Sequence, residues 1–156
     1  MRVVDFLSPD AIIPTLAGVS KEAVLSEMSA FVAARQTPPG SIDARALLPV
    51  LEEREQLAST AIGDGIAIPH GKLDTIDHLI GVLGRSVPGL AFDSIDGKLT
   101  HIVFMLVAPS NAAGIHLTAL ARLSRLFRDP GFRQRLIESA DGATMYRTIA
   151  EEDAKY

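Results

Sequence analysis

The stretch from Gly63 to Lys72 reads Gly-Asp-Gly-Ile-Ala-Ile-Pro-His-Gly-Lys and places one histidine at the end of a short apolar run. Residues 66–68 are typical of a brief buried strand. Pro69 lacks a backbone donor and does not continue a central strand, and Gly71 lets the chain turn away. We therefore predict that His70 lies on a stiff exit from the sheet, with its ring pointing outward. Near neutral pH its imidazole is partly uncharged, so a ring nitrogen is available to attack phosphorus or bind a metal.

Upstream of this stretch the sequence predicts two helices. Ser20 is a suitable N-cap for a helix that runs to about residue 35, with a periodic apolar face. The turn Pro38-Pro39-Gly40 ends that helix. A second helix is expected from about residue 43 to residue 55, and Pro49 should kink it or delay its start.

Downstream the sequence predicts strands. Residues 79–84 and 102–108 are apolar, and the second run is typical of a strand covered on both faces. Residues 90–93 are expected to form a brief edge piece before the tight turn at Asp96-Gly97, which favours an antiparallel pair.

The C-terminal third predicts three more helices, at about 114–128, 130–139 and 142–151, the last two capped by Asp129 and Asp141. In the first of them we expect Leu117 and Ala121 to face the core, and Arg122 to face solvent. Helices at both ends with strands between them favour an α/β fold, in which a mixed β-sheet is flanked by helices on both faces.

Composition excludes several classes of protein. The length of 156 residues predicts a single domain over residues 1–156, and a hydrophobic content of 47% is enough for one core. The chain contains no cysteine, which excludes disulfides, thiolate zinc sites and a cysteine nucleophile. A net charge of −4 argues against nucleic-acid binding. No segment is long and apolar enough for membrane insertion, and the N-terminus does not have the pattern of a secretory signal, so we expect a cytoplasmic protein.

The chain has four histidines, and two of them have settings that suggest chemistry. His70 ends the apolar run described above. His116 begins a predicted helix, where free backbone N–H groups favour an anion. His101 is expected at the mouth of a strand, and His78 in an exposed polar link.

Arg54 is the best candidate for a phosphate partner, although its acidic neighbours on their own favour a solvated helix face with ion pairs. Ser59 and Thr60 either supply donors or form a turn. The glycines of residues 63–65 are too few for a nucleotide-binding P-loop, and the chain lacks the G-x-S-x-G motif of a serine hydrolase.

Taken together, these segments resemble the enzyme IIA domain of the fructose/mannitol class of the phosphoenolpyruvate-dependent phosphotransferase system, most closely its nitrogen-regulatory branch. The resemblance runs from about residue 5 to residue 149 and rests on these blocks: Leu7-Ser8-Pro9-Asp10, Arg54-Glu55, Ser59-Thr60, Ile62-Gly63, Gly65-Ile66-Ala67-Ile68-Pro69-His70-Gly71-Lys72, Ala91-Phe92-Asp93-Ser94-Ile95-Asp96-Gly97 and His116-Leu117. In two places the chain departs from the family pattern. Ala58 stands where the family usually has glycine, and Pro49 interrupts a helix.

The resemblance implies a fold, a chemistry and partners. His70 would accept a phosphoryl group as tele-phosphohistidine from an HPr-like phosphocarrier protein. Arg54 would hold the phosphate and His116 would be the second active-site histidine. Ser59, Thr60 and Gly65 would support the phosphate loop. No cofactor and no metal would be needed, and the group would pass to a regulated protein or to a IIB domain.

Four functions remain open at this point. The first is a phosphocarrier with a regulatory output, and the second is the same chemistry feeding a sugar permease through a IIB domain. The third is a metal-dependent hydrolase or metal-binding module that uses His70, His101 and His116, although no H-x-x-x-H or H-E-x-x-H spacing is present. The fourth is a binding module without chemistry, in which His70 is an ordinary loop residue.

Overall fold

The computed structural model describes residues 1–35 and 41–156, so the predicted turn at Pro38-Pro39-Gly40 lies outside the described residues. The strands are β1 (Ile12–Ile13), β2 (Ala61–Gly63), β3 (Ile66–Ala67), β4 (His70–Leu73), β5 (Ile80–Leu90) and β6 (Thr100–Pro109). The helices are α1 (Lys21–Ala34), α2 (Ala44–Leu57), α3 (Ala113–Leu126), α4 (Pro130–Glu138) and α5 (Gly142–Asp153), with a short 3₁₀ helix at Val3–Asp5.

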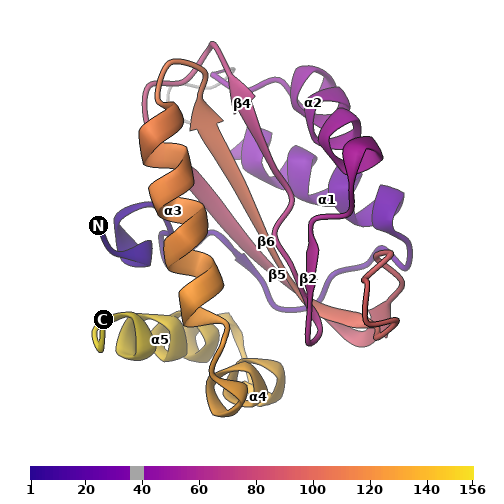
Figure 1. Cartoon of the computed structure of the whole chain (residues 1–156), viewed down its shortest axis with the longest axis vertical. Helices are drawn as coiled ribbons and strands as arrows, with labels where there is room; N and C mark the ends of the chain where they lie inside the picture. The colour runs from indigo at the N-terminus through magenta and orange to yellow at the C-terminus, as the bar shows by residue number, and fades with distance from the viewer. Residues whose placement is uncertain (36–40) are drawn as a thin grey trace.

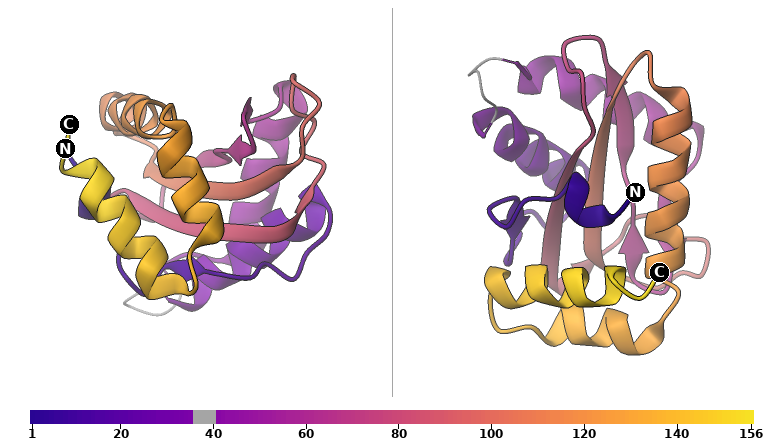
Figure 2. Two further views of the ribbon diagram at one scale, coloured as in Figure 1. Left: turned by 90° about the horizontal axis from the view of Figure 1, so that it is seen from below. Right: turned by 90° about the vertical axis from the view of Figure 1, so that its left-hand side faces the viewer.

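All six strands join one mixed sheet with the order β1-β5-β6-β3-β2, and β4 also pairs with β6. β5 runs antiparallel to β6, whereas β3 and β4 run parallel to it. α3 covers one face of the sheet and α1 and α2 cover the other, as Figure 1 shows, while α4 and α5 lie across one end (Figure 2). The predicted α/β class, with a mixed sheet between helices, is confirmed.

Capping side chains set the starts of four helices; three of them were predicted as caps, and the fourth, Asp43, was predicted only as the approximate start of its helix. The side chains of Ser20, Asp43, Asp129 and Asp141 each accept a hydrogen bond from a backbone N–H in the first turn of the helix that follows. α2 begins directly after Asp43 and contains Pro49 in its interior, so the proline does not delay its start. Within the described residues, no helix has the length and apolar character needed to cross a bilayer.

β6 is the centre of the sheet. Residues 102–108 are all buried, as the continuous apolar run predicts for a strand with helices on both faces. β5 is longer than the predicted strand over residues 79–84. The predicted edge piece at residues 90–93 is wrong, because residues 91–99 form a loop with a turn in which the Gly97 N–H donates to the Ser94 carbonyl at 3.0 Å.

The prediction that His70 leaves the sheet is also wrong. β4 begins at His70 and pairs in parallel with β6, with His70 opposite Leu106. Pro69 cannot donate a hydrogen bond, but its carbonyl accepts one from the Leu106 N–H at 2.9 Å. The chain is therefore held against β6 through the proline, and pairing resumes one residue later.

The predicted inner face of α3 is rotated from the one in the structure. Leu117 is 67% exposed and Ala121 is exposed, whereas Ala119 and Leu123 are buried. Arg122 does not face solvent freely, because its guanidinium pairs with the buried Asp153 carboxylate at 2.7 Å. A buried His116 sets this face, since residues three and seven positions later lie on the same side of a helix.

Candidate functional site

Two of the four histidines meet where β4 begins to pair with β6. The rings of His70 and His116 lie with their centroids 5.2 Å apart, edge to face at 68°. His70 comes from the first position of β4 and is half-buried, and His116 comes from the first turns of α3 and is buried. The tertiary fold thus pairs the two residues that the resemblance singles out.

The ring of His70 is oriented by the backbone two residues before it. Its Nδ1 lies 2.8 Å from the carbonyl oxygen of Ile68. A carbonyl oxygen only accepts, so Nδ1 must carry the proton. In the neutral ring the lone pair is then on Nε2, which is the nitrogen that forms tele-phosphohistidine.

Both imidazoles are held in the neutral form. Burial lowers the pKa of His70, and the nearby charges of Arg54 and Lys72 lower it further, against the opposing effects of the Ile68 hydrogen bond and Glu55. Burial, with smaller effects from His70 and Lys72, lowers the pKa of His116 to about 4. At pH 7 His70 is therefore able to act as a nucleophile.

One ring nitrogen of His116, Nε2, makes no hydrogen bond within the described residues. This atom is buried. Buried polar atoms are nearly always paired, so this nitrogen is available to form a hydrogen bond with a group that binds beside His70. The N-cap of α3, Ala112, also contributes no side-chain hydrogen bond to the free amides of the first turn. An anion next to His70 would give Nε2 of His116 a partner.

We expect the titration of His116 to report this anion. In the unmodified protein its imidazole should titrate near pH 4, and a phosphoryl group on His70 should raise the pKa of His116 toward its ordinary value, because the added negative charge favours the imidazolium. Histidine ring NMR signals, followed through a pH titration of both forms, measure this directly. An unchanged His116 titration in the phosphorylated protein would contradict the contact.

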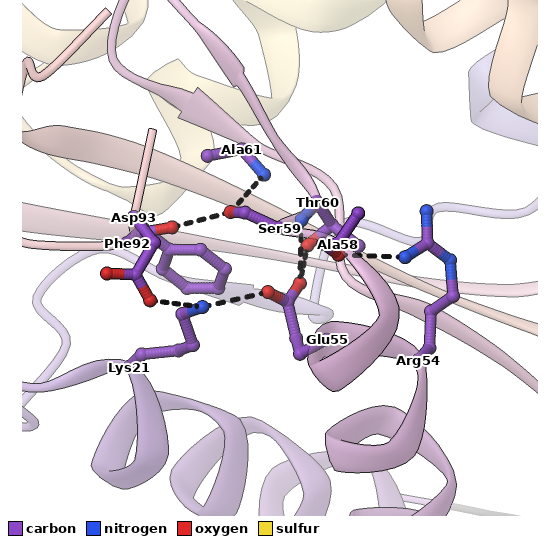
Figure 3. Close-up of polar contacts among 9 residues, drawn as sticks. All are labelled: Lys21, Arg54, Glu55, Ala58, Ser59, Thr60, Ala61, Phe92 and Asp93. Atoms are coloured by element: carbon purple, nitrogen blue, oxygen red, sulfur yellow. Dashed lines mark hydrogen bonds and ion pairs between the residues drawn. The ribbon is translucent and has the colours of Figure 1, made fainter. Parts of the chain in front are cut away.

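Arg54 lies in the last turn of α2 and directs its guanidinium to the loop that follows (Figure 3). Its Nη1 donates to the Ala58 carbonyl at 2.8 Å, and its charge is close enough to lower the pKa of His70. Arg54 makes no ion pair within the described part of the chain, so the alternative of an ion-paired helix face has no contact to support it. Ala58 has an extended backbone with φ −169° that any residue adopts, so alanine fits in place of glycine.

Ser59 and Thr60 use their hydroxyls inside the loop (Figure 3). The Ser59 hydroxyl donates to the Phe92 carbonyl at 2.6 Å and accepts from the Ala61 N–H. The Thr60 hydroxyl and N–H both bind the carboxylate of Glu55. These two residues therefore shape the loop next to His70, and their hydroxyls are already engaged.

The structure does not bring Gly65 or His101 to this site. Gly65 lies in the turn between β2 and β3 with φ +82°, a conformation that suits glycine, and its carbonyl accepts from the His101 N–H. His101 is five positions before Leu106, the β6 partner of His70, or roughly 15 Å along the strand. The exposed His78 pairs with Asp77 elsewhere. A three-histidine metal site has no geometric basis here, and no cluster of three or more potential metal ligands occurs in the described residues.

The sequence pattern predicts no role for Lys21 and places Glu55 on a charged helix face. Glu55 is buried, and its carboxylate pairs with the Lys21 ammonium at 3.0 Å. A signal was present, because Glu55 follows the buried Leu51 and Leu47 at intervals of four residues. A carboxylate on the apolar face of a helix is rarely buried unless it has a partner.

Comparison with known proteins identifies the family of the chain. Residues 5–152 match the family described as phosphoenolpyruvate-dependent sugar phosphotransferase system, EIIA 2. The chain is 40% identical over 150 residues to a nitrogen regulatory protein of Bradyrhizobium diazoefficiens, a match that covers 96% of this chain and 95% of that protein. It is 33% identical over 154 residues to the fructose-specific EIIABC component of Bacillus subtilis, covering 98% of this chain but 24% of that protein. The crystal structure of nitrogen regulatory protein IIA-Ntr from Neisseria meningitidis superposes with a TM-score of 0.86 at 26% identity, over 94% of this chain and 98% of that one.

Proposed function

Because the chain belongs to the EIIA 2 family of the phosphoenolpyruvate-dependent sugar phosphotransferase system, we propose that His70 is the residue on which it carries the phosphoryl group. Domains of this family are phosphotransferase components that carry phosphohistidine. The observation that supports His70 most directly is the hydrogen bond from its Nδ1 to the Ile68 carbonyl, which leaves the lone pair on Nε2. The neighbouring His116, with its unpaired Nε2, supports the same choice.

The transfer is an in-line exchange between two imidazoles. The Nε2 lone pair of His70 forms a bond to phosphorus while the bond from phosphorus to the donor's histidine nitrogen breaks, and that nitrogen keeps the bonding pair. Negative charge is spread over the three phosphoryl oxygens during transfer, so donors aimed at them lower the barrier. His116 would donate one hydrogen bond from Nε2, and Arg54 would contribute its guanidinium after releasing the Ala58 carbonyl. Ser59 and Thr60 would hold the loop in place, while Gly65 would act only through the distant turn.

Replacing Arg54 by glutamine should slow phosphorylation by about 100-fold or more, which is the loss typical when one donor to a developing negative charge is removed. The rate is measured with limiting phosphorylated carrier and rapid quenching at alkaline pH. Arg45→Gln is a matched control, because Arg45 lies at the other end of α2 and pairs only loosely with Asp43. Equal rates for Arg54→Gln and Arg45→Gln would exclude a role for Arg54 in the transfer.

The donor we propose is an HPr-like phosphocarrier protein, which must bring its own histidine to His70. Ile115 and Leu117 flank His116 on α3 and are exposed, which suits a shallow apolar docking surface. We place this exchange in the cytoplasm, where a phosphoenolpyruvate-driven relay has its substrate.

We further propose that the output is regulatory. The chain matches a nitrogen regulatory protein at 40% identity over 96% of this chain and 95% of that protein. Two fructose-specific relatives match at 33% and 36% identity, over 24% and 73% of their own lengths. A phosphoryl group adds up to two negative charges beside α3 and changes what this surface binds. The second candidate, transfer to a IIB domain of a sugar permease, remains open because related sugar-specific EIIA components share the chemistry.

One labelling experiment tests the acceptor and separates the two outputs. The protein is incubated with phosphoenolpyruvate, enzyme I and an HPr-like carrier, and is then analysed by mass spectrometry under alkaline conditions. We expect one phosphate on the peptide that contains His70. A purified IIB protein is then added: retention of the phosphate supports the regulatory output, and rapid transfer supports the sugar-permease output. Phosphate on any other peptide would overturn the choice of His70.

A further inference from the structure

We propose that Glu55 is a positioning residue for His70: through Thr60 and Ile68 it fixes the carbonyl that orients the imidazole and selects its Nδ1–H tautomer. This inference rests on the proposed function, since it explains how His70 is prepared for phosphoryl transfer. It assigns a role to a buried carboxylate that itself does not touch the transferred group.

The contacts form an unbroken chain from α2 to the ring. The Glu55 Oε1 accepts from the N–H of Thr60 at 3.0 Å and also from its hydroxyl. The Thr60 carbonyl accepts from the Ile68 N–H at 3.0 Å, and the Ile68 carbonyl accepts from His70 Nδ1 at 2.8 Å. Glu55 therefore positions Thr60, Thr60 positions Ile68, and the Ile68 carbonyl orients the ring of His70.

The far end of the chain is anchored by Lys21 (Figure 3). Its ammonium lies between the carboxylates of Glu55 and Asp93, at 3.0 and 2.8 Å, and 5.2 Å from the centre of the Phe92 ring. The side chains of Lys21 and Glu55 are only 12% and 5% exposed, so this pair is shielded from water. A carboxylate fixed on one side by a cation presents its other oxygen to Thr60 in a single direction.

The charge of Glu55 is a weaker explanation for its effect on His70 than its hydrogen bonds to Thr60. Around His70 stand Arg54 and Glu55 from α2, Lys72 from β4 and His116 from α3. Arg54 and Lys72 oppose the influence of Glu55 on the ring, so its charge is largely offset there. The two hydrogen bonds from Thr60 to Glu55 instead fix the position of Thr60, and this gives Glu55 a geometric role.

The test compares Glu55→Ala, which removes the acceptor, with Glu55→Gln, which keeps an acceptor oxygen and removes the charge. The tautomer of His70 is measured by ¹⁵N NMR on the unphosphorylated protein, and the rate of phosphorylation is measured separately. In Glu55→Ala we expect the Nε2–H tautomer to become a substantial fraction and the rate to fall by about 10- to 100-fold, as when the outer partner of a functional histidine is lost. Glu55→Gln should retain the Nδ1–H tautomer.

A control variant at Glu53 and a second pair of variants at Thr60 complete the test. Glu53→Gln removes an exposed carboxylate from the same helix and should leave the tautomer and the rate unchanged. If Glu55→Ala does not fold, Thr60→Val removes the hydroxyl link and should shift the tautomer in the same direction, whereas Thr60→Ser should restore it. Nδ1–H persisting in folded Glu55→Ala, or in Thr60→Val where that is the variant tested, would overturn the proposal. Because the tautomer is read without phosphate, this outcome is distinct from a failure of His70 to be labelled.

Discussion

We expect His70→Ala to abolish uptake of phosphate from the phosphorylated carrier and to retain the fold. The substitution removes the Nε2 lone pair, and the neighbouring imidazole of His116 does not replace it, because that residue is buried and only 6% exposed. His70 is half-buried at the start of β4, where pairing with β6 uses backbone groups that alanine also has. The measurement is mass analysis at alkaline pH, with circular dichroism as the check of folding.

The control for this prediction is His78→Ala. His78 is exposed, and its ring contacts only the neighbouring carboxylate of Asp77, so the variant should be labelled at the wild-type rate. Normal labelling of His70→Ala would mean that the acceptor is elsewhere. Loss of labelling in both variants would instead point to damage at the docking surface.

We expect Lys21→Met to destabilise the protein by about 3 kcal/mol, the lower end of the cost of leaving one member of a buried ion pair unpaired. Burial on its own would lower the pKa of Lys21, but hydrogen bonds to Asp93 and Glu55 outweigh it and raise the pKa, so the ammonium is charged when the pair forms. Asp93 is 80% exposed and contributes little, so the cost comes from Glu55, whose carboxylate stays buried without a cation. For a domain of this size the melting temperature should fall by roughly 6–12 °C.

The double variant Lys21→Met/Glu55→Gln identifies the cause of this loss. A neutral amide has no charge to leave uncompensated and keeps an acceptor for Thr60, so the double variant should be more stable than Lys21→Met alone. Lys98→Met is the surface control: Lys98 is exposed and lies 3.9 Å from Asp64, so its removal should change stability by about 0.5 kcal/mol or less. Equal stability of Lys21→Met and Lys98→Met would exclude a buried pair of this strength.

Helix caps and apolar runs predicted helices and strands well, because each acts on residues close to it in the sequence. Four capping side chains mark helix starts because an Asp or Ser oxygen satisfies free N–H groups whatever surrounds it. The apolar run at residues 102–108 indicates a buried strand for an equally local reason, since only a position covered on both faces tolerates it. The prediction that Leu117 lies on the buried face of α3 was wrong, because a pattern of hydrophobicity counts the buried His116 as a polar residue.

The re-entry of the chain at His70 could not be predicted from the residues around it. Pro69 predicts an interruption, and whether pairing resumes depends on β6, whose Leu106 N–H reaches the Pro69 carbonyl. The buried position of Glu55 likewise depends on α1, because the ammonium of Lys21 on that helix pairs with the buried carboxylate.

The sequence by itself determined most of the helices and strands and the α/β class, because these depend on intrinsic backbone preferences and on residue type. By its resemblance to a family it also pointed to His70 as the candidate acceptor. Only the tertiary structure decided which groups meet that imidazole. The second histidine, His116, comes from α3. The lone pair of His70 is on Nε2 because Nδ1 donates to the Ile68 carbonyl, and hydrogen bonds through Thr60 to Glu55 hold Ile68 in place. Contacts between residues far apart in the chain arise from packing, which no local pattern encodes.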